Sequence, residues 1–334
     1  MLRKEKGTGI VRRNSTHVDH ADTWPAAPRK LVAIQGIEGS FHHQAACELL
    51  TEPFTIMPCT TFRQVFDAVG SGRAHSAVVA VENSVYGSIN AVHRLLQTAT
   101  VQVQAETCLN VDQYLITAGS LSLESITDVI SQTPALEQCE TWLGAHLPHA
   151  RLVEGDDTAM SVRDVVARSD IRWAAVGGEH AAKRYGGTIV AGPINDAPNN
   201  RTRFFLIDNS PVAASMAGKT SVIVSTGPNS GSLQHSLSVF DVPGVNVSRL
   251  DSHPIPGSAW RYSLYIDFES SNTSGLGARI IDSLRAQMYA VTVLGSYPPS
   301  EIHRLDEDEV SVGQNAARSS VHTATRLPPL ESHQ

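Results

Sequence analysis

The sequence predicts an α/β fold in two lobes, followed by a smaller domain with the ferredoxin-like order β-α-β-β-α-β. Short apolar runs alternate with helix-like segments from residue 31 onward, which is typical of a parallel sheet with helices on its faces. The same alternation resumes in a second stretch, and a late strand at 203–207 follows a loop rich in Pro and Asn. After 208–218, a segment of small residues that we interpret as a linker, the pattern changes.

The first lobe is predicted at about 31–108 together with 200–209. Its first strand, 31–35, is apolar and runs into a turn with two glycines, which indicates a buried strand ending in a tight turn. The elements expected next are helix 41–50, strand 54–57, helix 62–69 and strand 77–81. We expect strand 203–207 to return to this lobe.

The second lobe is predicted at 109–191, and the smaller domain at 218–296. The elements expected in the second lobe are strands 114–117, 151–153 and 173–176, and helices 135–143, 158–167 and 179–185. Those of the smaller domain are strands 220–225, 245–250, 261–268 and 290–294, and helices 231–240 and 276–284. The strands and helices of this domain follow the ferredoxin-like order.

Both ends of the chain are predicted to be disordered. Residues 1–30 are polar and basic and lack the apolar core of a secretory signal, so we interpret them as a disordered arm, with an organelle transit peptide as the alternative. Residues 298–334 carry the acidic cluster Asp306-Glu-Asp-Glu309 and no periodicity, which indicates a solvated acidic tail.

The composition restricts the classes of partner. The net charge is −7, from 26 Lys and Arg against 33 Asp and Glu. This overall negative charge gives no reason to expect binding to nucleic acid or to an anionic membrane. No apolar run approaches the roughly 20 residues that span a bilayer. The four cysteines show no C-x-x-C pair or metal-ligand spacing, which predicts a reducing, cytoplasmic compartment and no metal.

Two motifs lie where expected strands end. In Gly36-Ile-Glu-Gly-Ser-Phe41, the glycines let backbone amides approach a ligand, and Ser40 can cap a helix whose N-terminus favours an anion. In Glu82-Asn-Ser84, polar side chains follow a buried strand, at the edge where open α/β sheets bind ligands. Each motif also has a purely structural alternative. The first would be an ordinary turn, and the second would be a helix cap with an Asx turn.

A third motif, Asn200-Arg-Thr-Arg-Phe204, opens the late strand. Its guanidinium groups suit bidentate capture of a carboxylate or phosphate. Because side chains alternate along a strand, Thr202 and Phe204 should share a face while Arg203 points away.

These three segments, in this order, resemble the G-P-x-G-[ST]-[FY], P-x-E-N-S-x-x-G-S and N-x-T-R-F motifs of prephenate dehydratase. Three more agree, namely Ala135-Leu-Glu-Gln-Cys139, Asp157-Thr-Ala-Met160, and 174–186. The resemblance runs from about residue 31 to 294. The departures are Ile37 and Ala80 in place of prolines, Asp157 in place of a serine, and Gln113 where histidine is common.

The resemblance implies a two-lobed, periplasmic-binding-protein-like catalytic domain and a carbon–oxygen lyase of L-phenylalanine biosynthesis. It would convert prephenate to phenylpyruvate, and because aromatisation drives the loss of CO2 and hydroxide, no cofactor is needed. Thr202 is implied as the catalytic donor to the departing hydroxyl, Arg203 as the partner of a substrate carboxylate, and Phe204 as a contact of the ring. The remaining substrate-binding residues implied are Ser40, Glu82, Asn83, Ser84, Gln138 and Thr158. Glu82 would orient its loop or be protonated.

The smaller domain resembles the ACT regulatory domain of the same family. Gly231-Ser232-Leu233 corresponds to its G-A-L motif, and Asp251-Ser252-His253-Pro254 to its E-S-R-P motif. The resemblance implies L-phenylalanine as an effector and a homodimer or homotetramer. His253 in place of arginine would weaken the response or make it depend on pH, unless it is simply a strand-end residue.

Two alternative functions remain open from the sequence. Arogenate dehydratase would use the same chemistry on a substrate with an ammonium group in place of the ketone. A non-catalytic, ACT-containing amino-acid sensor would share the fold without needing Thr202 between two arginines.

Overall fold

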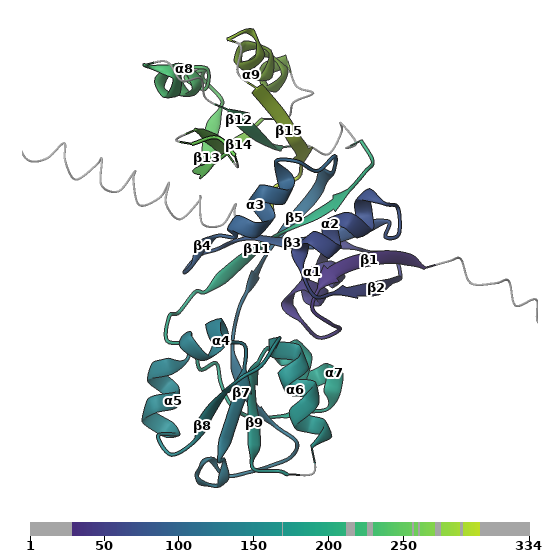
Figure 1. Cartoon of the computed structure of the whole chain (residues 1–334), viewed down its shortest axis with the longest axis vertical. Coiled ribbons are helices and arrows are strands. Elements are labelled where there is room, and N and C mark those ends of the chain that lie inside the picture. Colours follow the sequence, from purple (N-terminus) through teal and green to yellow (C-terminus); the bar gives the residue numbers. More distant parts are fainter. Residues whose placement is uncertain are drawn as a thin grey trace, which may run out of the picture.

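A computed structural model describes residues 29–168, 170–211, 218–225, 230–255, 257–259, 261–270, 275–287 and 290–300. The expected arm, apart from residues 29 and 30, lies outside the described residues, as do the tail from 301 and most of the linker. Three sheets follow one another along the long axis of the molecule (Figure 1). Among the described residues, no helix is long and apolar enough to cross a membrane.

The first lobe has a mixed sheet, where a parallel one was expected. Its strands are β1 (Lys30–Gln35), β2 (Phe54–Cys59), β3 (Ser76–Asn83), β4 (Gly87–Ser88), β5 (Gln102–Asn110) and β11 (Arg201–Asp208). The order is β2-β1-β3-β11-β5, with β4 paired to β3. Strand β11 returns to this lobe as predicted, but it enters from the second lobe without a crossover helix and is therefore antiparallel to both neighbours.

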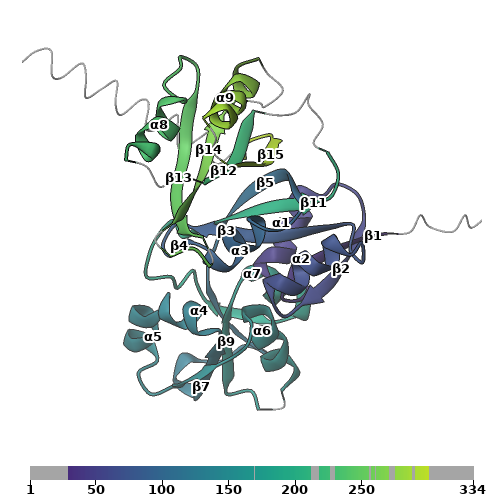
Figure 2. The ribbon, with the colours of Figure 1, turned by 45° about the horizontal axis from the view of Figure 1, so that its top comes forward.

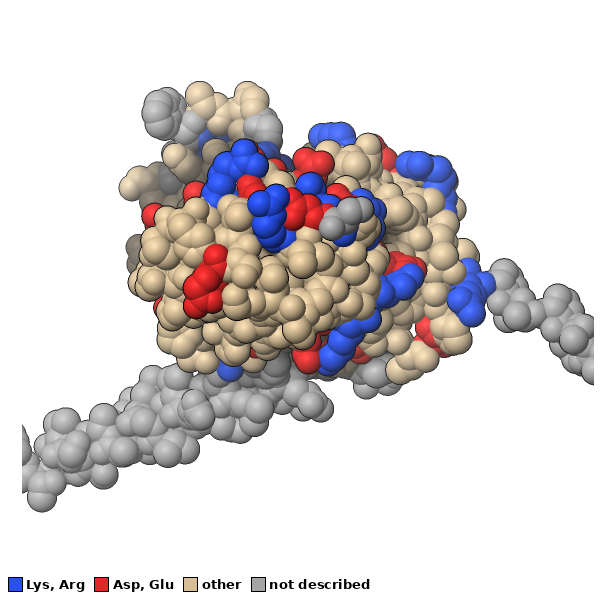
Figure 3. Space-filling model, turned by 90° about the horizontal axis from the view of Figure 1, so that it is seen from below, with Lys and Arg blue, Asp and Glu red and all other residues tan. Residues whose placement is uncertain are grey.

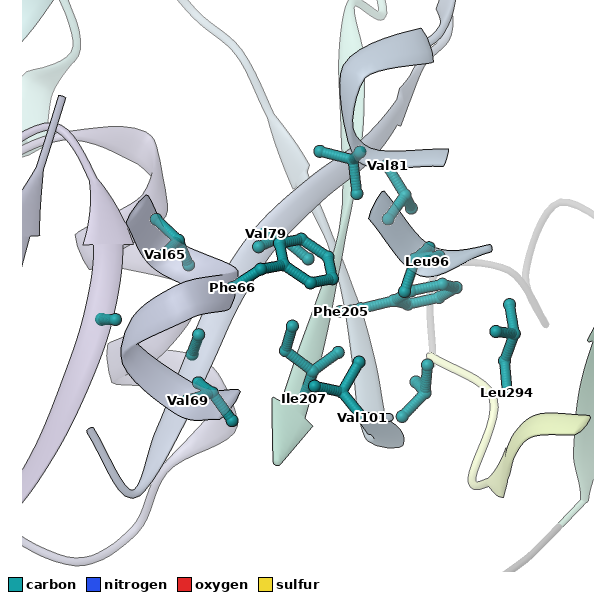
Figure 4. Close-up of a cluster of buried hydrophobic side chains, with 14 of the residues drawn as sticks. Val65, Phe66, Val69, Val79, Val81, Leu96, Val101, Phe205, Ile207 and Leu294 are labelled. Carbon is teal, nitrogen blue, oxygen red and sulfur yellow. The ribbon is translucent and has the colours of Figure 1, made fainter. Parts of the chain in front are cut away.

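Helices cover both faces of this sheet. They are α1 (Phe41–Leu49), α2 (Phe62–Gly70) and α3 (Asn90–Leu96). Alternation along β11 sends Phe204 and Leu206 into a core beneath α1, and Phe205 and Ile207 into a core with α2 and α3. Figure 4 shows the second of these cores, with Phe205 and Ile207 among side chains of α2, β3 and α3.

The second lobe holds a mixed sheet of order β10-β6-β9-β7-β8. Its strands are β6 (Tyr114–Thr117), β7 (Asp128–Ser131), β8 (Arg151–Glu154), β9 (Trp173–Gly177) and β10 (Thr188–Ala191), and its helices are α4 (Thr133–Glu137), α5 (Glu140–His146), α6 (Thr158–Ala167) and α7 (Glu179–Tyr185), with a 3-10 turn at Leu123–Ser125. The single helix expected at 135–143 is two, because the chain leaves the helical region at Cys139 (φ −122°, ψ 12°).

Charges of both signs intermingle among the described residues on the face seen from below (Figure 3).

The third sheet has the predicted ferredoxin-like topology. Its elements are β12 (Lys219–Ser225), α8 (Ser232–Ser238), β13 (Asn246–Pro254), β14 (Tyr262–Glu269), α9 (Gly275–Ala286) and β15 (Ala290–Tyr297). The order is β13-β14-β12-β15, antiparallel throughout. We call this unit the ferredoxin-like domain.

The ferredoxin-like domain packs directly on the first lobe. Gly295 of β15 lies against the Val103 backbone of β5, where a side chain would clash. Leu294, Tyr297 and Tyr265 belong to the same buried cluster as β3, β11, α2 and α3. The two units therefore share one hydrophobic core, and Leu294 appears at its edge in Figure 4.

Candidate functional site

Strand β3 carries a β-bulge at the point where its polar residues begin. Val81 and Glu82 together lie opposite the single residue Arg203, and the next pair is Thr202 with Asn83. The extra residue turns Asn83 to the face that carries Thr202 and Glu82 to the face that carries Arg203. Without the bulge, alternation along the strand would send Asn83 to the opposite face.

Two histidines bind backbone groups of this bulge, one from each face of the sheet. The Ala80 N–H donates to Nε2 of His42 in α1 (3.3 Å), and Nε2 of His93 in α3 lies 3.0 Å from the Val81 carbonyl oxygen. Burial lowers the pKa of each imidazole to about 4, so both are neutral near pH 7. Neither residue was singled out from the sequence, because their partners are strand backbone atoms.

Asn83 fixes the hydroxyl of Thr202. Its Oδ1 accepts from the N–H groups of Val85 and Tyr86, both at 2.9 Å, which sets the orientation of the amide. Its Nδ2 then donates to Oγ1 of Thr202 (2.9 Å) and Oδ1 of Asn200 (2.7 Å). Within the described part of the chain, the Thr202 hydroxyl donates to no protein acceptor, so its hydrogen is available to a bound molecule.

Ser84 joins β3 to the start of β11. Its Oγ accepts from the Arg201 N–H (2.9 Å) and donates to the Asn199 carbonyl (3.2 Å). The expected role as a substrate contact therefore competes with two structural hydrogen bonds, and Ser84 serves first to hold Thr202 in register with Asn83.

Residues of the two lobes meet around Gly36. Ser40 caps α1 as predicted, and Asp157 caps α6 by accepting from the Met160 N–H. A Cβ at Gly36 would lie 2.9 Å from Asp157 Oδ2 and 3.4 Å from Ser40 Oγ, so only glycine lets these groups approach. Thr158 is buried in the first turn of α6. Burial raises the pKa of the Asp157 carboxyl, against hydrogen bonds from backbone N–H groups that lower it.

The same turn is fastened to α7 of the second lobe. Nε of Arg184 donates to the Glu38 carboxylate (2.6 Å), and the Tyr185 hydroxyl donates to the Glu38 carbonyl (2.6 Å). The two lobes are thus held together beside Ser40 and Asp157.

Gln138 comes from the second lobe toward the loop after β3. Its Oε1 accepts from Gln113 Nε2 (3.4 Å). Burial raises the pKa of the Tyr86 phenol, and the Gln138 side chain lies near enough to the Tyr86 hydroxyl to lower that pKa. The structure thus places Gln138 near Tyr86, whose backbone N–H binds Asn83 Oδ1, and the sequence did not single out Tyr86.

The expectation that Arg203 binds a substrate carboxylate is wrong. Its side chain is 4% exposed, and its guanidinium pairs with Glu106 of β5 and Asp267 of the ferredoxin-like domain, both at 2.6 Å. Lys219 reaches the other oxygen of Glu106 (3.1 Å). Although burial opposes ionisation of Asp267, the Arg203 and Lys219 cations hold its pKa at about 2. Arg203 points away from Thr202, as alternation predicted, and into the domain junction.

The proposed substrate contacts of Phe204 and Glu82 are also not those observed. Phe204 is fully buried beneath α1, edge-on to His42 with ring centroids 5.2 Å apart. Glu82 lies on the Arg203 face because of the bulge, and its Oε2 is 3.0 Å from Nε of Arg249. Its role in orienting the loop, which the sequence left open, fits this position.

The two expected effector segments lie at the same end of the third sheet. Ser225, which precedes α8, pairs with Ser263, and Ser263 pairs with His253. Gly231 begins α8 with φ 85°, while Ser232 is buried and Leu233 is 51% exposed. Ser252 and Pro254 are exposed, whereas Asp251 Oδ2 accepts from Ser88, Arg249 and His253.

Within the ranges that the structure describes, two side-chain clusters have the composition of metal ligands, His43–Cys47–His180 and His93–Asp251–His253. In the first, Nδ1 of His43 accepts from the Gly39 N–H, so Nε2 holds the proton that a metal would displace. In the second, Arg249 Nη2 already lies 3.0 Å from Asp251 Oδ2. We assign no metal to either cluster.

Fold and site together define a two-lobed α/β protein with an oriented hydroxyl on β11 and a contact between the lobes at Gly36. The family model described as prephenate dehydratase matches residues 32–212. The bifunctional chorismate mutase/prephenate dehydratase of Aquifex aeolicus is 32% identical over 267 residues, covering 80% of this chain and 73% of that protein. The protein of the same description from Neisseria gonorrhoeae is also 32% identical, covering 80% and 74%.

Solved structures agree with the sequence comparison. Prephenate dehydratase from Arthrobacter aurescens in complex with L-Phe superposes with a TM-score of 0.72 at 26% identity, covering 88% of this chain and all of that one. GqqA, described as a novel type of quorum-quenching acylase, gives 0.72 at 27% identity, covering 82% and 99%. The chain belongs to the prephenate dehydratase family, a family of lyases, as its motifs predicted.

Proposed function

We propose that this chain converts prephenate to phenylpyruvate, with Thr202 as the catalytic hydroxyl. The observation that carries the proposal is the hydrogen bond from Asn83 to Thr202 Oγ1, which leaves the hydroxyl hydrogen free for a ligand. As the ring carboxylate leaves as CO2, its electron pair enters the ring and the opposite C–O bond breaks. The departing hydroxide takes up a proton that comes from solvent and leaves as water. Thr202 donates a hydrogen bond to that oxygen as it gains charge.

The test is turnover of prephenate by the purified chain, followed by the ultraviolet absorbance of phenylpyruvate, with arogenate assayed in parallel. Thr202→Val should lower kcat by about 10²–10⁴-fold while KM changes little. Thr202→Ser keeps a hydroxyl and should retain more activity, and Thr141→Ala, at an exposed position of α5, is the control. Near-normal turnover by Thr202→Val would remove Thr202 from the catalytic role. Because one fold can host different chemistries, absence of turnover on both substrates would favour the amino-acid sensor or an activity like that of the acylase neighbour.

We further propose that the ferredoxin-like domain is an ACT domain that binds L-phenylalanine at Gly231–Leu233 and 251–254, in a homodimer or homotetramer. The strand register, which sets both segments at one sheet end, and the bound L-Phe of the Arthrobacter aurescens protein support this. Calorimetric titration with L-phenylalanine, and light scattering for the oligomeric state, test it. The four free cysteines support the cytoplasmic location that we propose.

The domain boundaries that we propose are 31–209 for catalysis and 218–296 for regulation. The family match ends at residue 212, which supports the first of these limits.

A further inference from the structure

Because of the β3 bulge, the side chains next to Asn83 and Thr202 point to the opposite face of the sheet, where the ferredoxin-like domain packs. Asn83 and Thr202 share one face of paired strands, and their neighbours Glu82 and Arg203 share the other. On that other face, Glu82 meets Arg249 and Arg203 meets Asp267, both partners coming from the ferredoxin-like domain. The strand segments that carry Asn83 and Thr202 are therefore held in place, on their opposite face, by the ferredoxin-like domain.

Arg249 is the centre of this contact. Its Nε lies 3.0 Å from Glu82 Oε2, its Nη2 lies 3.0 Å from Asp251 Oδ2, and Nη2 also donates to Ser88 Oγ (2.7 Å). The Arg249 side chain is 10% exposed, whereas that of Glu82 is 36% exposed, so solvent screens this pair in part. Figure 2 shows β13, which carries Arg249, reaching β4 at this point.

His93 binds the bulge from the same face as Arg249. Its Nε2 lies between the Val81 carbonyl oxygen (3.0 Å) and Nη2 of the Arg249 guanidinium (3.2 Å), while its Nδ1 is buried without a hydrogen bond among the described residues. The ring stacks on His253, with centroids 4.7 Å apart and planes at 22°. A movement of segment 251–254 would therefore reach the bulge through His93 and through Arg249.

We propose that Arg249 is a positioning residue for Thr202, acting through Glu82 to hold the β3 bulge that aims Asn83 at the threonine hydroxyl. The proposal rests on the function proposed above. It also suggests how an effector could change activity. Arg249 pairs with both Glu82 and Asp251, and Asp251 belongs to the expected effector segment. A ligand that draws Asp251 or His253 away from Arg249 or His93 would loosen the aim of Asn83 without entering the catalytic site.

The test is a double-mutant cycle between Glu82 and Arg249 in the full chain. Arg249→Gln and Glu82→Gln should each lower kcat by about 10- to 100-fold, with KM changed by less than about threefold, because a misaimed donor costs rate more than binding. The double variant should be no slower than the slower single variant, since both remove one interaction. Arg249→Lys should restore part of kcat. Arg285→Gln, at an exposed cation of α9, is the matched control and should leave kcat unchanged.

A second readout does not depend on turnover. The N–H groups of Val85 and Tyr86 bind Asn83 Oδ1, so Arg249→Gln should speed hydrogen exchange of segment 84–88 while exchange in the second lobe stays unchanged. Unaltered kcat and unaltered exchange in Arg249→Gln, or strictly additive effects in the cycle, would overturn the proposal. If the unmodified chain lacks turnover, the proposed function fails, and exchange alone then decides whether Arg249 holds the bulge.

Discussion

Both the oxygen and the nitrogen of the Asn83 side-chain amide are hydrogen-bonded within the protein. The two backbone N–H groups that bind its Oδ1 leave the amide nitrogen as the only group facing Thr202. This polarity decides which way the threonine hydroxyl points, because an acceptor at that position would take the hydrogen that the substrate needs.

Asn83→Asp should therefore lower kcat by about 10²-fold or more, although the two side chains have nearly the same shape. The carboxylate would accept the Thr202 hydrogen instead of leaving it free. Steady-state kinetics with prephenate measure the effect, and Asn90→Asp, at an exposed position that opens α3, serves as the control. Full activity in Asn83→Asp would show that the direction of this hydrogen bond is irrelevant.

Asp157, which stands in place of the serine of the motif that this segment resembles, places a carboxylate beside Gly36 and Ser40. A negative charge there attracts the ammonium group of arogenate and repels the anionic prephenate tail. Asp157→Ser should raise the ratio of kcat/KM for prephenate to that for arogenate by about 10-fold, given that unit charges about 4 Å apart interact by a few kcal/mol near a protein surface. Serine also caps helices, so α6 should keep its start. An unchanged ratio would place the substrate's amino or keto group elsewhere.

At the scale of elements, periodicity predicted the faces of β11 but not the course of β3. The opposite directions of Thr202 and Arg203 follow from simple alternation, and in the structure Thr202 meets Asn83 while Arg203 meets Asp267 of the ferredoxin-like domain. The bulge at Val81 could not be foreseen, because an apolar run before Glu82 has the same composition with or without an extra residue. For the same reason Glu82 was expected beside the substrate, whereas it faces the other domain.

Strand β5 was missed for a different reason. Its residues include Gln102, Gln104 and Glu106, which obscure the apolar pattern of a buried strand. Glu106 is buried because Arg203 and Lys219, 97 and 113 positions away, reach it. No local signal reports partners at such separations, so the ion network at the domain junction required coordinates.

Helices α1 and α3 each present a neutral histidine to β3, and this predicts a pH dependence of stability. Burial lowers the pKa of His42 and His93 from 6.5 to about 4, so the folded state binds fewer protons than the unfolded state between these values. The contribution of these two histidines to stability should be constant above pH 6.5 and should fall as pH drops toward about 4. Thermal unfolding across this range measures the slope, and His93→Gln should make it shallower. An equal slope in that variant would exclude His93 as a contributor.

For the whole molecule, the junction between the first lobe and the ferredoxin-like domain combines a shared core with buried charges. Because Arg203 and Glu106 are almost wholly enclosed by this contact, separating the domains would leave charged groups without compensation. The two units should therefore unfold together.

Asp267→Asn tests this coupling. Removing one partner of a buried ion pair should lower the free energy of unfolding by about 3 kcal/mol. Urea denaturation measures the loss, and Asp282→Asn, at an exposed ion pair of α9, should cost less than about 0.5 kcal/mol. A small loss in Asp267→Asn, or a separate early transition of the ferredoxin-like domain, would contradict a single cooperative unit.

The position of β11 also fixes an order of events during protein synthesis. This strand lies between β3 and β5 in the sheet, yet it is translated after every strand of the second lobe. While the nascent chain leaves the ribosome, the second lobe has all its strands before the first lobe has the strand that joins β3 to β5. The sheet of the first lobe can be completed only after Asp208, the last residue of β11, has emerged. Until then β3 and β5 have no strand between them to pair with.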